Sequence, residues 1–140
     1  MTVGQPWLWE AEDGSASGKT TVLGYTQPVS SVGNAAEEAG EQGYVWSAVE
    51  AKVCVDKGTL LTGHANWALA YEDGAVVQPS SSMYDDFPKP EYPIETTVKA
   101  GRCVRGKVVF PVPGSQRPSL VTFSPVGAES ATAEWTVSAK

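Results

Sequence analysis

One segment of the sequence imitates a phosphate-binding loop. It runs from Gly14 to Thr20 and ends in Gly-Lys-Thr. In a true loop of this kind, two glycines separated by four residues precede a helix whose backbone amides hold the phosphate. Here the glycine spacing is one residue short, and the residues that follow Lys19 are typical of a strand. We therefore expect no nucleotide site.

Nucleophilic catalysis would have to depend on His64, which is the only histidine. A serine or cysteine nucleophile needs a base within hydrogen-bond reach. His64 follows the turn-like pair Thr62-Gly63, and the chain has no Gly-x-Ser-x-Gly motif. We interpret His64 as a loop or edge residue and predict that the protein is not an enzyme. A concave pocket that holds His64 with a carboxylate and a hydroxyl would instead indicate a hydrolase.

Acidic side chains gather at Asp85, Asp86 and Glu91. Paired carboxylates can perform acid–base catalysis, and carboxylate oxygens also bind calcium. Adjacent residues of an extended chain point to opposite sides, however, so Asp85 and Asp86 do not share a site by default. A solvated loop is the plainer interpretation, with weak calcium or carbohydrate binding as the alternative.

Aromatic residues accompany these acids and also occur near the start of the chain. Tyr84, Phe87 and Tyr92 surround the acidic segment, and Trp7 and Trp9 flank a leucine. Exposed aromatic side chains are common anchors at protein interfaces. We take these five as candidate partner-binding residues, although packing against the edge of the domain or beneath the loop is the plainer interpretation.

Cys54 and Cys103 are the only cysteines, and with one histidine they are too few for a structural zinc site. We predict no metal and no cofactor. Either a disulfide or two buried thiols remain. A disulfide closing this loop would stabilise the fold by about 4 kcal/mol and would place the protein outside a reducing cytoplasm.

Composition and charge limit the classes of partner that the protein can bind. The net charge is −6 and the pI is about 4.7, which opposes binding to nucleic acid or anionic membranes. Five bases between residues 99 and 117 have no acid among them, and we interpret them as a solvated strand face. No apolar run approaches the ~18–20 residues that span a bilayer, so we expect no transmembrane segment.

Each cysteine lies in a segment where apolar and polar residues alternate, as in a strand. In residues 44–55 the apolar side chains of Val49, Ala51 and Val53 share one face, and Cys54 lies on the other. The same alternation in residues 103–112 places Cys103 opposite the apolar face. Two outward-facing cysteines at strand ends favour a cross-strand or strand-to-loop bond over a bond through the centre of a sandwich.

The remaining pattern predicts an all-β protein. About seven short strands separated by turns, with no convincing helix, indicate an antiparallel β-sandwich over residues 19–140. Residues 1–18 are expected to form a tail or lead-in, and 33–43 a loop or single turn. Residues 78–97 hold four prolines and are expected to form one long loop. The other expected strands are 20–27, 67–71, 75–77, 120–123 and 133–137.

Several motifs from Thr20 onward resemble a known family. They are Val53-Cys54, Trp67-Ala-Leu-Ala-Tyr-Glu-Asp-Gly74, Asp86-Phe-Pro-Lys-Pro90, Lys99-Ala-Gly-Arg-Cys103, Gly106-Lys-Val-Val-Phe-Pro-Val-Pro113 and Trp135-Thr-Val137. The chain resembles small secreted proteins and lipoproteins of actinobacteria whose immunoglobulin-like domain is similar to the mycobacterial immunoprotective extracellular protein. This resemblance implies an immunoglobulin-like fold, a Cys54–Cys103 disulfide and an extracellular or cell-surface location, but no catalytic residue.

From these observations we predict a monomeric, non-catalytic extracellular binding or adhesion module that recognises a protein or a cell-envelope component. The alternative is a structural or accessory envelope lipoprotein domain without a dedicated ligand. A contiguous exposed patch of aromatic residues would favour the binding module, and a uniformly polar surface would favour the accessory domain.

Overall fold

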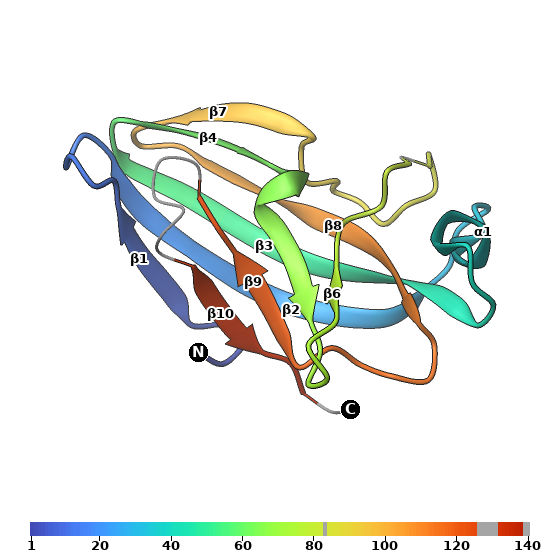
Figure 1. The fold of residues 1–140 in the computed structure, drawn as a ribbon. Coiled ribbons are helices and arrows are strands. Elements are labelled where there is room, and N and C mark those ends of the chain that lie inside the picture. Colours follow the sequence, from blue (N-terminus) through green and yellow to red (C-terminus); the bar gives the residue numbers. More distant parts are fainter. Residues whose placement is uncertain (83, 126–131, 139–140) are drawn as a thin grey trace.

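In a computed structural model, which describes residues 1–82, 84–125 and 132–138, the chain is built from antiparallel sheets. Two four-stranded sheets pack face to face, and a two-stranded sheet lies along one edge of the sandwich, beside β3 and β8 (Figure 1). The predicted all-β class is confirmed, but the described residues form ten strands and not seven. The first sheet contains, in spatial order, β1 (Pro6–Glu10), β2 (Ser17–Val29), β3 (Tyr44–Lys57) and β8 (Cys103–Pro113).

The second sheet contains the hairpins that the sequence predicts. Its spatial order is β10 (Ala133–Thr136), β9 (Leu120–Phe123), β5 (Trp67–Ala70) and β6 (Val76–Val77). A short 3-10 helix, η1 (His64–Asn66), leads into β5. No helix in the described part of the chain is long and apolar enough to cross a membrane.

The two-stranded sheet was missed by the sequence analysis. It pairs β4 (Thr59–Gly63) with β7 (Glu95–Lys99), and β7 lies partly within the segment predicted as a loop. Leu60 faces Val98 across the pair, and both side chains are buried. Each strand is only five residues long and contributes a single apolar contact of this kind, so neither shows sustained alternation in the sequence.

The expectation that residues 1–18 form a tail is wrong. Residues 6–10 form strand β1, and Trp9 pairs with Gly18 of β2 and is 5% exposed. A Cβ atom at Gly18 would lie 2.7 Å from the Trp9 ring, so the glycine makes room for the indole. Thr2 also forms a bridge with Thr136, which ties the start of the chain to the second sheet (Figure 1).

The main core lies between the two large sheets. The predicted inward residues of β3 and β8 are buried there, together with the aromatic rings of the second sheet. The ring centroid of Trp67 lies 4.6 Å from that of Phe123 and 6.1 Å from that of Trp135. Burial of such large rings supplies most of the apolar contact that holds the sheets together.

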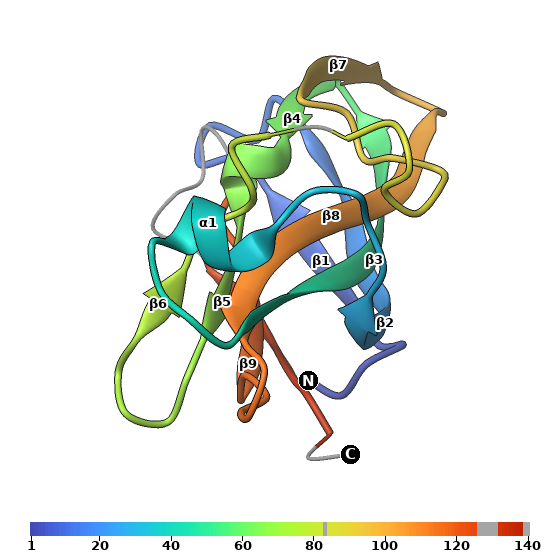
Figure 2. The same cartoon turned by 90° about the vertical axis from the view of Figure 1, so that its right-hand side faces the viewer.

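A second, smaller core lies on the outer face of the first sheet. The five-residue helix α1 (Ala35–Ala39) covers one end of β3 and β8, as Figure 2 shows. The helix begins after Asn34, whose side chain accepts a hydrogen bond from the Glu37 amide, and ends at Gly40 with a φ of 73°. The predicted single turn is therefore ordered. The second core consists of Ala35, Trp46, Ala48, Phe87 and Val109.

The disulfide is formed as a cross-strand bond. Cys54 of β3 lies directly opposite Cys103 of β8, and their sulfur atoms are bonded. Both residues lie on the outer face of the first sheet, as the alternation predicts. The pairing also agrees with the one that the resemblance implies.

Candidate functional site

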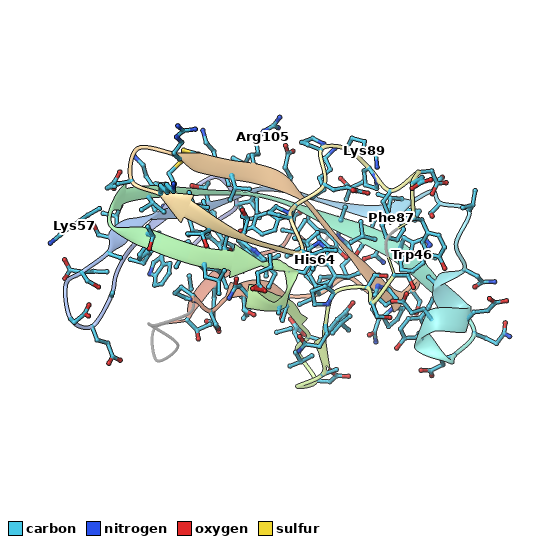
Figure 3. The ribbon with its side chains drawn as sticks, turned by 90° about the horizontal axis from the view of Figure 1, so that it is seen from above. Trp46, Lys57, His64, Phe87, Lys89 and Arg105 are labelled. Carbon is cyan, nitrogen blue, oxygen red and sulfur yellow. A yellow bond between two sulfur atoms is a disulfide. The ribbon has the colours of Figure 1, made fainter. Side chains whose placement is uncertain are left out.

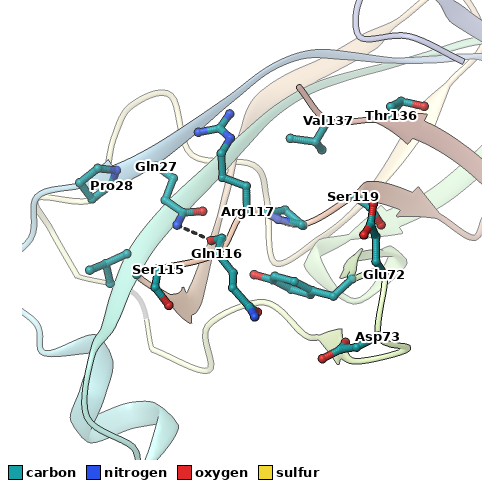
Figure 4. Close-up of a pocket in the computed structure, with 14 residues that line it drawn as sticks. Gln27, Pro28, Glu72, Asp73, Ser115, Gln116, Arg117, Ser119, Thr136 and Val137 are labelled. Carbon is teal, nitrogen blue, oxygen red and sulfur yellow. Dashed lines mark hydrogen bonds between the residues drawn. The ribbon is translucent and has the colours of Figure 1, made fainter. Parts of the chain in front are cut away.

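A polar groove lies at one end of the sandwich, where several loops meet (Figure 4). Its volume is about 830 Å³, within the range of ~300–1,000 Å³ that is typical of small-ligand sites. The groove is lined by the end of β2, the turn after β5, the connection from β8 to β9 and the end of β10. None of the residues proposed as sites from the sequence lies in it.

Gln27 forms one wall of the groove and is fixed by hydrogen bonds. The Tyr25 hydroxyl donates to Gln27 Oε1 at 2.5 Å. Gln27 Nε2 donates to the carbonyl oxygen of Gln116 at 2.8 Å, the bond drawn in Figure 4, and to that of Pro113 at 3.2 Å. These bonds join the end of β2 to the connection between β8 and β9, so the wall is preorganised.

Charged groups of opposite sign lie on different sides of the groove. Figure 4 shows Arg117 on the side of Gln27, and Glu72 and Asp73 on the other side. Arg117 Nε donates to the Ser138 carbonyl oxygen at 2.9 Å, and its guanidinium carbon lies 5.1 Å from the centre of the Tyr25 ring. The terminal nitrogens of Arg117 form no hydrogen bond or ion pair with the described residues.

Tyr71 also lines the groove, and its hydroxyl is unusual. The residue is 8% exposed, and the hydroxyl oxygen is buried without a hydrogen-bond partner. Burial raises the pKa of this hydroxyl, so it stays protonated and can donate a hydrogen bond. A buried hydroxyl without a partner costs free energy and calls for an explanation. In the part of the chain that the structure describes, the other buried polar side-chain atoms without partners belong to Trp9, Thr20 and Trp67, none of which lines the groove.

The candidate partner-binding aromatics do not form a surface patch. Trp9, Phe87 and Tyr92 are at most 5% exposed, and Trp7 and Tyr84 are partly buried against the two cores. The sequence had left both a surface and a packed position open for these rings. The structure therefore places these rings where they stabilise the fold, and three of them are out of reach of a partner.

His64 lies near a hydroxyl and a carboxylate, but not in a catalytic arrangement. His64, Ser80 and Glu91 border one small space that is too narrow to admit a water molecule. His64 Nε2 donates to the Tyr92 carbonyl oxygen at 2.9 Å, and the Ser80 hydroxyl lies 2.9 Å from Glu38 Oε1. The contact between nucleophile and base that catalysis requires is thus not made by these residues.

The acidic side chains of residues 85–91 form hydrogen bonds and an ion pair with neighbouring loop residues. Asp86 accepts hydrogen bonds from the Ser31 hydroxyl and the Val32 amide, both at 2.8 Å. Glu91 forms an ion pair with Lys89 at 2.9 Å. Within the described residues, no three His, Cys, Asp or Glu side chains are grouped so that they could hold a metal ion.

No family model and no curated protein matches this chain. Solved structures do match it. The fold is similar to that of MPT63, a secreted protein from Mycobacterium tuberculosis. The TM-score is 0.71 at 14% identity, over 97% of this chain and 95% of MPT63. The likeness to MPT63 shows a shared fold and no more.

Two further structures have a related fold. The yjhA protein from Bacillus subtilis matches with a TM-score of 0.68 at 11% identity, over 99% of this chain and all of the other. A functionally unknown protein from Listeria monocytogenes matches with a TM-score of 0.54 at 12% identity, over 94% of this chain and 79% of the other. The fold therefore occurs in proteins of very different sequence.

Proposed function

We propose that this protein is an exported, non-catalytic binding module that holds a small polar ligand in the groove at the end of the sandwich. The observation that carries the proposal is the buried hydroxyl of Tyr71, which lacks a partner beneath a groove of ligand size. A ligand that enters the groove and reaches this hydroxyl would supply the missing hydrogen-bond acceptor.

Export is supported by the disulfide and by the fold. The Cys54–Cys103 bond is of the kind that persists in oxidising compartments. MPT63, which has a similar fold, is a secreted protein. The immunoglobulin-like relationship to actinobacterial secreted proteins and lipoproteins, and attachment to the cell surface, are part of the same proposal.

The charges around the groove favour a ligand with separated positive and negative groups. The planar guanidinium of Arg117 fits a carboxylate through two parallel hydrogen bonds. Glu72 and Asp73 on the other side attract an ammonium group (Figure 4). A short peptide with both termini free carries both groups at a spacing that a groove of this volume can accept.

Titration of isotope-labelled protein with short peptides tests this function. We expect chemical-shift changes at the amides of the groove residues when the peptide termini are free, and weaker changes when they are capped. The variant Arg117→Gln should lose about 10-fold or more in affinity, because a hydrogen bond to a charged group contributes about 1.5–3 kcal/mol. Lys89→Gln is the matched control, since Lys89 lies outside the groove.

Two results would contradict the proposal. In the first, the resonances of the groove amides stay unchanged with every peptide tested. In the second, the Arg117→Gln and Lys89→Gln variants bind the peptide with equal affinity. Either result would favour the alternative, an accessory domain of the cell envelope without a dedicated ligand. The burial of Trp9, Phe87 and Tyr92 is the specific observation in favour of that alternative.

A further inference from the structure

The positive charges of this acidic protein are gathered on one side of the molecule. The four strands of the second sheet contain no lysine or arginine. Arg117 lies between β8 and β9. The other lysines and arginines of the described residues lie in β2, β3, β7 and β8, or in the segments that precede β7 and β8. They are Lys19, Lys52, Lys57, Lys89, Lys99, Arg102, Arg105 and Lys107.

Strand register brings several of these cations together on the outer face of the first sheet. Lys52 of β3 lies directly opposite Arg105 of β8, and Lys19 of β2 lies opposite Cys54. Lys19 and Lys52 are therefore diagonal neighbours, about 7–8 Å apart at their Cα atoms. Like charges placed directly opposite each other destabilise a sheet, and the ion pair between Arg105 and Glu50 offsets part of that cost here.

Two acids of β3 share this face: Glu50 lies opposite Lys107, and Asp56 lies two residues beyond Cys54. Only two ion pairs occur among residues 1–82, 84–125 and 132–138, and they join Arg105 to Glu50 at 2.5 Å and Lys89 to Glu91 at 2.9 Å. Figure 3 shows Arg105 and Lys89 projecting from the same side of the ribbon. Lys19, Lys52 and Arg102 are exposed and have no ion-pair partner within these ranges.

A groove extends the positive face toward the turn between β7 and β8. Its volume is about 520 Å³, and it is lined by Lys99 and Arg102, by two threonines and by Cys103 of the disulfide. From Arg102 to Lys107 the strand rises about 16 Å, and the three strands β2, β3 and β8 add about 10 Å across. The cations thus form an open strip and not a closed pocket for one small anion.

We propose that this strip binds a linear polyanion that carries phosphate groups along its chain. The strip offers several unpaired cations spaced along a surface, and each one contacts a separate phosphate. The acidic remainder of the protein, which brings the net charge to −6, repels the polymer and so confines it to this side. The polyanion site shares no residue with the groove lined by Gln27, Tyr71 and Arg117. An experiment can therefore disprove binding at one site without disproving binding at the other.

Binding of long-chain polyphosphate, compared with triphosphate at equal phosphate concentration, tests this inference. If four cations make contact, the logarithm of the association constant should fall with the logarithm of salt concentration with a slope of about −3. Triphosphate should bind at least about 10-fold more weakly, because it cannot reach several cations of the strip at once.

A matched pair of double variants separates local contacts from net charge. Lys52→Gln with Arg102→Gln removes two charges from the strip, and Gln42→Glu with Gln78→Glu changes the net charge equally at exposed positions elsewhere. The first pair should lose about 10-fold or more in affinity and about 1.5 units of the salt slope, whereas the second should change little. Absence of binding, binding insensitive to salt, equal affinity for triphosphate, or equal losses in both pairs would overturn the inference.

Discussion

Cys54 lies directly opposite Cys103 in the β3–β8 pair, and their disulfide lies on the outer face of the first sheet, away from the main core. The bond joins two residues separated by 49 positions. It therefore restricts a large part of the unfolded chain while displacing none of the apolar residues between the sheets. Its contribution to stability should be separable from that of core packing.

We expect reduction of this disulfide to lower the free energy of unfolding without changing the fold. For a loop of this length the chain-entropy model gives about 4 kcal/mol. Urea unfolding with and without reductant measures the difference, and intact mass should rise by two hydrogens on reduction. An unchanged mass would show free thiols and contradict both the bond and the argument for export.

Phe87→Ala should be strongly destabilising, because Phe87 is 2% exposed and packs against Trp46 with ring centroids 5.1 Å apart. Truncation of a buried phenylalanine costs about 3–5 kcal/mol. Val32→Ala is the control, since Val32 is 84% exposed. Denaturant unfolding measures both variants, and a loss below about 1 kcal/mol for Phe87→Ala would mean that the second core is not formed in solution.

Gly106 allows the segment around Tyr92 to cross closely over β8. A Cβ atom at Gly106 would lie 2.4 Å from the backbone nitrogen of Tyr92, which cannot move independently of its chain. We expect Gly106→Ala to cost at least about 1–3 kcal/mol. Gly24→Ala is the matched control in β2 of the same sheet, because no atom lies within 4 Å of its Cβ position. Equal melting temperatures for the two variants would contradict the close approach.

Buried tyrosines should make the protein sensitive to alkali. Burial raises the pKa of Tyr92 and of Tyr25 above the ordinary value of 10.0, and hydrogen bonds offset this only in part. The folded state therefore holds these protons more tightly than the unfolded state. Their contribution to stability is fully present below pH 10 and is lost as the pH rises through the folded-state values.

The alkaline loss can be followed by urea unfolding at several pH values, together with tyrosinate absorbance. Tyr92→Phe should show a shallower decline above about pH 10 than the unmodified protein. Equal slopes for the two proteins would mean that Tyr92 ionises normally in the folded state.

Strand alternation predicts the long elements of this fold well and the short ones poorly. In β3 and β8 each inward position is apolar over many residues, so both the core and the outward cysteines follow from the sequence. In β4 and β7 the pairing shows only one buried apolar contact, between Leu60 and Val98, so the sequence has no sustained alternation there. The packing of Trp9 agrees with the plainer sequence interpretation, but strand β1 itself was missed because residues 1–18 show no sustained alternation.

The groove could not be predicted because its residues come from four segments that are far apart in the sequence. Gln27, Tyr71 and Arg117 belong to different elements, and each is an ordinary loop or strand-end residue in the sequence. Only the tertiary fold shows that Tyr71 is buried without a partner. The same applies to the positive strip, since strand register, and not sequence distance, places Lys52 opposite Arg105.

A comparison of Tyr71→Phe with Tyr92→Phe tests the central claim most directly. Both residues are buried, but the Tyr92 hydroxyl lies 2.7 Å from Thr62 Oγ1, whereas that of Tyr71 has no partner in the described residues. In urea unfolding of the free protein, Tyr92→Phe should lose about 1 kcal/mol, and Tyr71→Phe should be unchanged or gain up to about 2 kcal/mol. A loss for Tyr71→Phe as large as that for Tyr92→Phe would show that the hydroxyl is already satisfied, and would contradict a groove that awaits a ligand.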